Sequence, residues 1–315
     1  MRFVDRAEIA RRLTYEVCIP LMREAMIAFS RGETKQLLRS IITLSEGRLF
    51  GVMPGAMGAE GPFGAKLISV FKDNGASGRP SHQGLVVLFE AESGAPVCVL
   101  DAAEITAIRT GAASAAATDA LARPDAHRLA LLGAGEQALT HARAISKVRR
   151  LSTISLWARS FERARSAAAK LSAELGVTVA AKPDVGAAVA DADIICTLTS
   201  ASEPILRGAW VPRGAHVNIV GSSYAGPAEV DADLVAAARF FVDSREGVLA
   251  QGGEFLRAKA AGRIGDGHIL AEIGAVLAGD APGRRNGDEI TAYKSLGHVV
   301  QDLASAAALY AMPEL

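Results

Sequence analysis

The sequence predicts an α/β fold with two parts: a doubly wound parallel sheet, and a discontinuous α+β domain formed by both ends of the chain. Between residues 129 and 242, short apolar runs alternate with amphipathic segments of helical periodicity. This alternation is typical of a parallel sheet with helices on both faces. Between residues 36 and 100, strand-like runs are joined by turns rich in Gly, Asn and Ser, which favours an antiparallel sheet.

The elements follow in chain order. A helix is predicted at 14–31, then strands at 36–44, 47–52, 66–71, 85–91 and 96–100, with turns at 72–78 and 92–94, and a helix of small residues at 103–122. The alternating region contains strands at 129–132, 152–157, 177–180, 194–198, 216–220 and 240–242, a helix that follows the first strand and runs to residue 148, and helices at 161–175 and 185–190. A strand at 290–293 and a helix at 296–310 are expected to pack back on the first domain. The predicted domains are therefore 1–115 with 290–315, and 116–289.

A glycine motif lies between the strand at 129–132 and the helix after it, and reads Gly133-x-Gly135-x-x-Ala138. Gly133 permits a tight turn, Gly135 lets the backbone approach a pyrophosphate, and the small Ala138 lets the helix pack on its strand. Because the motif follows a buried strand and opens a helix, it predicts a Rossmann dinucleotide-binding domain.

The end of the second strand of this domain predicts the cofactor. A carboxylate that binds the ribose 2′-hydroxyl of NAD normally lies here. The sequence instead reads Ala158-Arg159-Ser160, and a guanidinium beside a hydroxyl suits a 2′-phosphate. A solvated arginine is common at the start of a helix, so NAD(H) remains an alternative, but the absence of the acidic residue as well favours NADP(H).

Bulk properties exclude several classes of protein. The formal net charge is +0 and no basic stripe is present, so a nucleic-acid partner is not expected. Charged residues interrupt every apolar run before it could span a bilayer, and no signal-peptide core is found. Three scattered Cys and six His have no metal-ligand spacing, so no metal is expected. We therefore expect a cytoplasmic protein.

Three cations are candidates for binding an acidic substrate. Arg109 lies in a helix made almost entirely of small residues, where a buried guanidinium needs an anionic partner. Lys66 lies within an apolar strand, and Arg48 follows a turn at the start of another. Each has an ordinary alternative, namely a surface salt bridge, a strand-edge lysine or a hairpin charge. Together they predict a site for a small amino or imino acid.

The chain resembles the ornithine cyclodeaminase/mu-crystallin family over almost its whole length. The resemblance is carried by Arg48 with Met53-Pro54, Lys66, Ser81-His-Gln-Gly84, Gly94-Ala-Pro96, Arg109-Thr-Gly-Ala-Ala113, Gly133-Ala-Gly-Glu-Gln137, Thr197-Leu-Thr199, His216-Val-Asn-Ile-Val-Gly221 and Lys294-Ser-Leu-Gly297. It implies a homodimer and reversible hydride transfer at the α carbon of an amino acid.

The resemblance also assigns roles to residues. Arg48, Lys66 and Arg109 would bind the substrate carboxylate, with Lys66 as the candidate for proton transfer, and Leu296 would contact the substrate. Ser160 joins the cofactor site through its place beside Arg159. The remaining residues implied to line the cofactor are Ser81, Thr110, Glu136, Gln137, Arg159, Thr199, Val220 and Ser295.

One position departs from the ornithine cyclodeaminases, which carry an Asp shortly after the Val-Gly that here ends at Gly221. This chain has Ser223, so the distal amine of ornithine would lack a counter-charge, at a cost of about 1–3 kcal/mol or more. The chain is more similar to the 1-pyrroline-2-carboxylate (ketimine) reductases, which form proline and sometimes pipecolate. The imine proton would come from Lys66, or from water near Ser223 and His82.

Two alternatives stay open. One is another activity of the same fold, either ornithine cyclodeamination or an alanine dehydrogenase-like reaction. The other is a non-catalytic NADPH-binding protein of the crystallin type.

Overall fold

The computed structural model describes residues 1–71, 73–74 and 79–314, so residue 72 and most of the predicted turn at 72–78 lie outside the described part. The chain divides into two compact units, unit 1 (Met1–Arg109 and His298–Leu315) and unit 2 (Thr110–Gly297). Both bounds differ from the predicted ones. The first lies inside helix α3 (Ala102–Leu121), and the second follows strand β15 (Thr291–Lys294).

Unit 1 contains a seven-stranded sheet of order β1-β7-β6-β5-β4-β2, with β3 also paired to β4. Its strands are β1 (Arg2–Val4), β2 (Lys35–Gln36), β3 (Ser40–Ser45), β4 (Arg48–Ala56), β5 (Phe63–Phe71), β6 (His82–Phe89) and β7 (Pro96–Asp101). The pairs are antiparallel except β1 with β7, which is parallel.

The predicted strand at 36–44 is two strands, β2 and β3, that follow the same edge of β4. Gln36 pairs with Gly55 and Ser40 pairs with Val52, so this edge has one residue more than β4 over the same stretch. An extra residue interrupts the ladder in the manner of a β-bulge. Periodicity does not reveal it, because the interruption depends on the partner strand.

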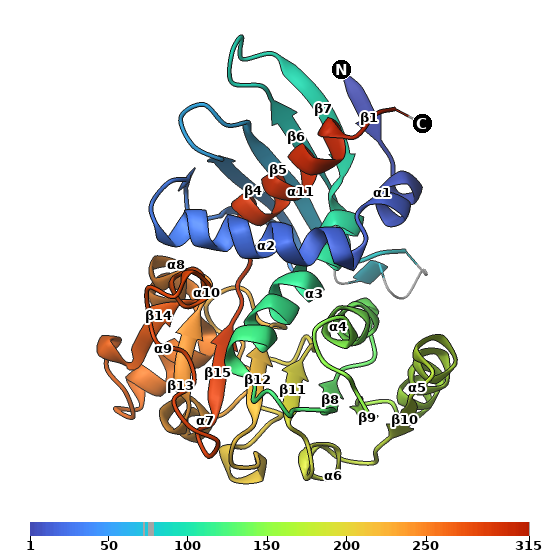
Figure 1. The fold of residues 1–315 in the computed structure, drawn as a ribbon, viewed down its shortest axis with the longest axis vertical. Coiled ribbons are helices and arrows are strands. Elements are labelled where there is room, and N and C mark those ends of the chain that lie inside the picture. Colours follow the sequence, from blue (N-terminus) through green and yellow to red (C-terminus); the bar gives the residue numbers. More distant parts are fainter. Residues whose placement is uncertain (72, 75–78, 315) are drawn as a thin grey trace. The chain divides into compact units, whose positions relative to one another are not determined.

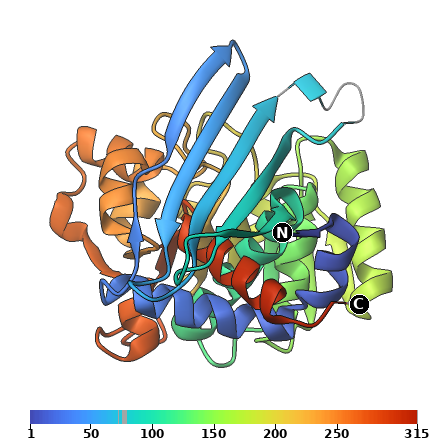
Figure 2. The ribbon, with the colours of Figure 1, turned by 90° about the horizontal axis from the view of Figure 1, so that it is seen from above.

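One face of the unit 1 sheet is covered by helices. Helix α11 (Val299–Ala311) packs on β4, β5 and β6 and against α2 (Tyr15–Ser30), as Figures 1 and 2 show, and α1 (Arg6–Arg12) contacts β7. Burial alternates along β6: Val86 and Leu88 are buried, whereas Leu85, which directly precedes Val86, is exposed. Alternate residues of a strand point to opposite faces, so the second face of the sheet carries apolar side chains that unit 1 leaves accessible.

Unit 2 contains an eight-stranded sheet of order β10-β9-β8-β11-β12-β15-β13-β14, and every pair in it is parallel. The strands besides β15 are β8 (Arg128–Leu132), β9 (Thr153–Trp157), β10 (Thr178–Ala181), β11 (Ile194–Thr197), β12 (His216–Ile219), β13 (Arg239–Val242) and β14 (Ile269–Glu272). The helices after α3 are α4 (Glu136–Ser146), α5 (Phe161–Leu175), α6 (Val185–Val189), α7 (Ala232–Ala237), α8 (Arg245–Gln251), α9 (Gly253–Ala260) and α10 (Ile273–Ala278).

Both faces of this sheet are covered, as predicted for a doubly wound fold. On one face Ile195, Val217 and Phe240 join a buried apolar cluster with residues of α6, α7 and α9. On the other face the buried Asn218 donates a hydrogen bond to Thr118 of α3. Figure 1 shows helices flanking the parallel strands. No helix in the described residues is long and apolar enough to cross a membrane.

Strand β15 corrects one prediction. Residues 290–315 were expected to return together to the first domain, but only helix α11 belongs to unit 1. Strand β15 lies between β12 and β13 and is buried along its whole length. The sequence of a short apolar run does not show where its strand lies in a sheet. Here the last strand in the sequence pairs with two earlier strands, β12 and β13, and lies between them. Strand β14 at the edge was also not predicted.

Candidate active site

The turn between β8 and α4 has the geometry that the glycine motif predicts. Gly133 has φ +134°, in the region that favours glycine, and a Cβ there would lie 2.5 Å from the Leu198 carbonyl oxygen. Its N–H donates to the carbonyl of Trp157 on the neighbouring strand at 2.8 Å. Any larger residue would force this turn away from β11, so the glycine is required by sterics.

The start of α4 fits a pyrophosphate. Gly135 is the N-cap, and a Cβ placed on it would meet nothing within 4 Å, so the space beside the helix start is open. The first N–H groups of a helix have no intrahelical acceptor and favour an anion. Glu136 is exposed and Gln137 half-buried at this helix start, while Ala138 is fully buried against the strand.

An exposed cation follows the end of β9. Arg159 is exposed, whereas the Ser160 hydroxyl caps α5 by accepting a hydrogen bond from the Arg163 N–H at 3.3 Å. Ser160 therefore has a structural role that accounts for its position. No acidic residue lies between Thr153 and Phe161, and the nearest one, Glu162, pairs with Arg165 at 3.6 Å.

A buried carboxylate that the sequence analysis missed joins the carboxyl ends of β11 and β12. Glu229 accepts four hydrogen bonds, from Thr197 Oγ1 (2.6 Å), Thr199 N (2.6 Å), Thr199 Oγ1 (2.7 Å) and Gly221 N (2.7 Å). Burial raises the pKa of the Glu229 carboxyl, against these hydrogen bonds. The two segments that it joins carry Thr199 and Val220, both implied to line the cofactor.

A second buried network in unit 2 supports the segment after β15. Lys294 donates to the carbonyl oxygen and hydroxyl of Ser222 at 2.6 and 2.7 Å and pairs with Glu254 at 2.9 Å. Asp243 accepts from the N–H groups of Leu296 (2.7 Å) and Gly297 (2.6 Å). These contacts fix the backbone of Ser295 and Leu296, which are both buried. The signal in the sequence was Lys294 itself, a charge at the end of an apolar strand.

In unit 1 the structure brings together two of the three predicted cations. Lys66 and Arg109 are 2% and 5% exposed, and Lys66 Nζ and Arg109 Nε each lie 3.1 Å from the same oxygen, Oδ1 of Asp302. Lys66 also donates to the Thr106 hydroxyl, and Arg109 Nη1 donates to Gln301 at 2.8 Å. Asp302 and Gln301, both on α11, were not predicted.

Burial and charge set the ionisation of this cluster. Burial lowers the pKa of Lys66 to about 8, with Asp302 opposing this shift and Arg109 adding to it. Burial raises the pKa of the Asp302 carboxyl, but Arg109 and Lys66 together bring it below its usual value. The cluster therefore holds two cations and one anion at neutral pH, which leaves a net positive charge for an acidic ligand.

Arg48, the third predicted cation, is not part of this cluster. Its side chain is 47% exposed, pairs with Asp73 at 2.6 Å and lies over the ring of Phe71. In the sheet Arg48 pairs with Phe71, whereas Lys66 pairs with Met53. Phe71 is five residues beyond Lys66 on β5, roughly 17 Å away on the opposite face. The prediction was wrong because strand register decides which residues meet.

Arg39 is the cation that sequence reasoning missed. It lies between β2 and β3, in the three-residue stretch that contains the extra residue, and its positive charge contributes to lowering the pKa of Lys66 and of His298. The sequence offered a signal, since Arg39 follows two leucines in a strand-like run.

The remaining predicted residues are distributed over both units. In unit 1, Ser81 Oγ lies 3.0 Å from His82 Nδ1 at the start of β6, the same end of the sheet as Arg48. In unit 2, Thr110 is buried within α3, at the residue where this unit begins, and Ser223 is half-buried in the segment after β12.

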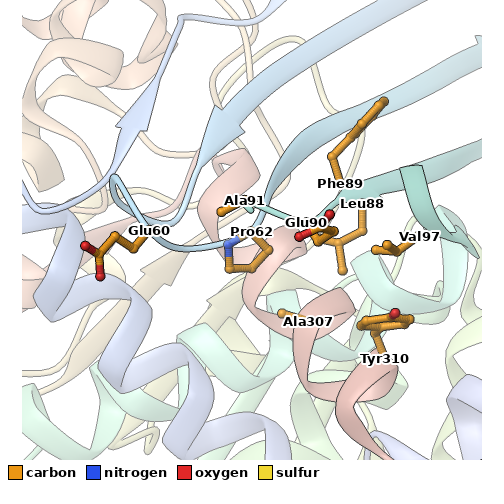
Figure 3. Close-up of a pocket in the computed structure, with 9 residues that line it drawn as sticks. All are labelled: Glu60, Pro62, Leu88, Phe89, Glu90, Ala91, Val97, Ala307 and Tyr310. Atoms are coloured by element: carbon orange, nitrogen blue, oxygen red, sulfur yellow. The ribbon is translucent and has the colours of Figure 1, made fainter. Parts of the chain in front are cut away.

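A separate cavity of about 300 Å³ lies in unit 1. Figure 3 shows its lining, which contains none of the predicted residues and consists of Glu60, Pro62, Leu88, Phe89, Glu90, Ala91, Val97, Ala307 and Tyr310. Among the residues that the structure describes, no cluster of His, Cys, Asp and Glu could hold a metal ion.

Comparison with known proteins identifies the family to which the chain belongs. The sequence model of the ornithine cyclodeaminase/mu-crystallin family matches residues 2–313. The chain belongs to the ornithine cyclodeaminase/mu-crystallin family. The resemblance predicted from the motifs is thereby confirmed.

Three relatives match this chain over almost its whole length. The ketimine reductase mu-crystallin of Mus musculus is 35% identical over 98% of this chain and 96% of its own. The Thermococcus litoralis Delta(1)-pyrroline-2-carboxylate reductase in complex with NADH and L-proline has a TM-score of 0.95 and 31% identity, over 98% of this chain and 96% of that one. An archaeal alanine dehydrogenase dimer with bound NAD has a TM-score of 0.92 and 26% identity, over 98% and 95%. These likenesses confirm the predicted fold class.

Proposed function

We propose that this family member reduces cyclic imino acids with a nicotinamide cofactor, converting 1-pyrroline-2-carboxylate to L-proline and 1-piperideine-2-carboxylate to L-pipecolate. The observation that carries the proposal is the pair of buried cations, Lys66 and Arg109, which share one carboxylate, Asp302, as their ion-pair partner among the described residues. The identity to ketimine reductase mu-crystallin and the likeness to a reductase bound to NADH and proline support the same chemistry.

The residues of unit 1 account for substrate binding and proton transfer. Lys66 and Arg109 bind the substrate carboxylate, because their cluster with Asp302 keeps a net positive charge. A bound nicotinamide cofactor supplies the hydride that adds to C2, while the ring nitrogen takes a proton as C=N becomes CH–NH. Lys66, with a pKa of about 8, carries that proton at neutral pH and transfers it to the nitrogen.

Unit 2 binds the cofactor, with NADPH preferred over NADH. The open space at Gly135 and the N-terminus of α4 receive the pyrophosphate. The exposed Arg159, with no acidic residue beside it, pairs with the 2′-phosphate. Gly133, Gln137, Thr199, Val220 and Ser295 line the rest.

The surroundings of Ser223 favour an imino acid without a charged side chain. Ser223 supplies no carboxylate for a distal amine. The two carboxylates bonded to this segment already have partners within the protein: Glu229 accepts from Thr197, Thr199 and Gly221, and Glu254 accepts from Ser222 and pairs with Lys294. A second cation would therefore lose its hydration without a counter-charge, which disfavours ornithine.

The uncovered face and edge of the unit 1 sheet support a homodimer. Ile42 is 57% exposed, and Ile41, Leu44 and Leu85 are exposed as well. Exposed apolar groups of this kind mark interaction surfaces, and a related alanine dehydrogenase is a dimer.

The test is the oxidation of NADPH, beside NADH, with 1-pyrroline-2-carboxylate as substrate. Turnover with the imino acid and no ammonia release from ornithine is expected. Lys66→Met should lower kcat/KM by about 10²–10⁴-fold, since a general acid contributes about that much. Arg48→Ala is the matched control, and its kcat/KM should remain near the wild-type value because Arg48 pairs with Asp73 at the surface. Release of ammonia from ornithine without imine reduction would refute the proposal.

A further inference from the structure

We propose that Asp302 is a positioning residue of this site, which holds the ammonium of Lys66 and the guanidinium of Arg109 on one oxygen and supplies the negative charge that faces both. The inference rests on the proposed function only for the role of Lys66 as proton donor. The arrangement of the three charges stands on geometry alone.

The geometry makes Asp302 the centre of the cluster. Its Oδ1 lies 3.1 Å from Lys66 Nζ on β5 and 3.1 Å from Arg109 Nε on α3, and its own side chain is fully buried on α11. The other hydrogen-bond acceptors of the two cations in the described residues, Thr106 and Gln301, are neutral. A single carboxylate therefore sets the separation and direction of both cationic groups.

The charges around Lys66 are unequal. Asp302 faces it from α11, Arg109 from α3, and Arg39 acts on it from the segment between β2 and β3. His298 at the start of α11 adds no charge at neutral pH, because burial lowers its pKa to about 3. Burial and both arginines favour neutral Lys66, and Asp302 is the group that opposes them. Removal of its charge should lower the pKa of Lys66 below about 8.

The second oxygen of Asp302 makes a clean substitution possible. Among the described residues Oδ2 has no hydrogen-bond partner, while Oδ1 accepts from both cations. In Asp302→Asn, the amide oxygen can keep the two contacts of Oδ1, and the NH2 group takes the place of an atom that faces no donor. The variant thus removes the charge and preserves the contacts.

The function-independent test is a titration of lysine labelled with ¹³C at Cε, followed by NMR in the protein without substrate, with Lys66 assigned from Lys66→Arg. The Lys66 midpoint should fall in Asp302→Asn by about one to three pH units, as expected when an adjacent opposite charge is lost. Asp73→Asn, which breaks only the exposed pair with Arg48, should leave the midpoint unchanged. An unchanged midpoint in Asp302→Asn would overturn the inference, whether or not the wild-type protein reduces imines.

Kinetics separate positioning from a general structural effect. The loss of kcat/KM with rising pH should begin at lower pH in Asp302→Asn than in the wild type. Asp302→Glu keeps the charge but cannot keep both 3.1 Å contacts, so its Lys66 midpoint should stay near the wild-type value while kcat/KM falls at least 10-fold. Wild-type kcat/KM in Asp302→Glu would refute the positioning role, even if Asp302→Asn failed to fold. A wild-type protein inactive on imino acids would refute the proposed function alone.

Discussion

Glu229→Gln tests whether one buried carboxylate holds together the carboxyl ends of β11 and β12 in unit 2. Oε1 accepts from the N–H and hydroxyl of Thr199, and Oε2 accepts from the Thr197 hydroxyl and the Gly221 N–H. Glutamine turns one of these oxygens into a donor. A hydroxyl can rotate to accept from it, but a backbone N–H cannot, so Thr199 N or Gly221 N loses its partner in either orientation.

An unpaired buried N–H costs about 1–3 kcal/mol, so the free energy of unfolding should fall by about that amount. Because the freed segments carry Thr199 and Val220, the Kd for NADPH should also rise, by about 10-fold for a loss of 1.4 kcal/mol. Urea denaturation and fluorescence titration measure the two quantities. Glu162→Gln, an exposed glutamate in the same unit, serves as control. Unfolding within about 0.5 kcal/mol of the wild type, together with unchanged NADPH affinity, would refute the reasoning.

Three further predictions concern the cofactor, the pH dependence of stability and the dimer. Arg159→Ala should raise the KM for NADPH by about 10–100-fold, since a charged hydrogen bond contributes about 1.5–3 kcal/mol, and should leave the KM for NADH unchanged. An equal effect in Arg165→Ala would argue against a specific contact between Arg159 and the phosphate. Burial lowers the pKa of His141 to about 4 in the folded protein, so the unfolded chain binds more protons between about pH 6.5 and 4 and stability falls as pH drops through this range. His141→Asn should flatten that dependence by up to about 1.4 kcal/mol per pH unit in denaturant titrations, and an identical slope would contradict it. Ile42→Lys should shift the protein towards monomer in analytical ultracentrifugation, whereas Leu270→Lys, an exposed leucine on β14, should not.

Local patterns predicted the parts of the molecule whose causes are local. The turn at Gly133 and the open N-cap at Gly135 follow from residue spacing within one strand–turn–helix segment. Lys66 and Arg109 were found because a charge amid apolar or small residues is costly to bury without a partner. These features depend on the chemistry of neighbours in sequence.

The parts that were not predicted depend on pairing across the chain. Asp302 lies 236 residues from Lys66 and 193 from Arg109, so neither cation identifies its partner by spacing. Arg48 was misplaced because its position in the site required the register between β4 and β5. The place of β15 between β12 and β13 is likewise a property of the assembled sheet.

The late position of β15 and α11 in the sequence has a consequence for synthesis on the ribosome. Until Thr291–Lys294 emerges, the nascent sheet lacks the strand between β12 and β13, and until Val299–Ala311 follows, the ammonium of Lys66 has no counter-ion from Asp302. Chains usually fold from the N-terminus as they are made. Here neither unit can be completed before residues 291–311 have been made, so both should reach the native state only after this segment has emerged.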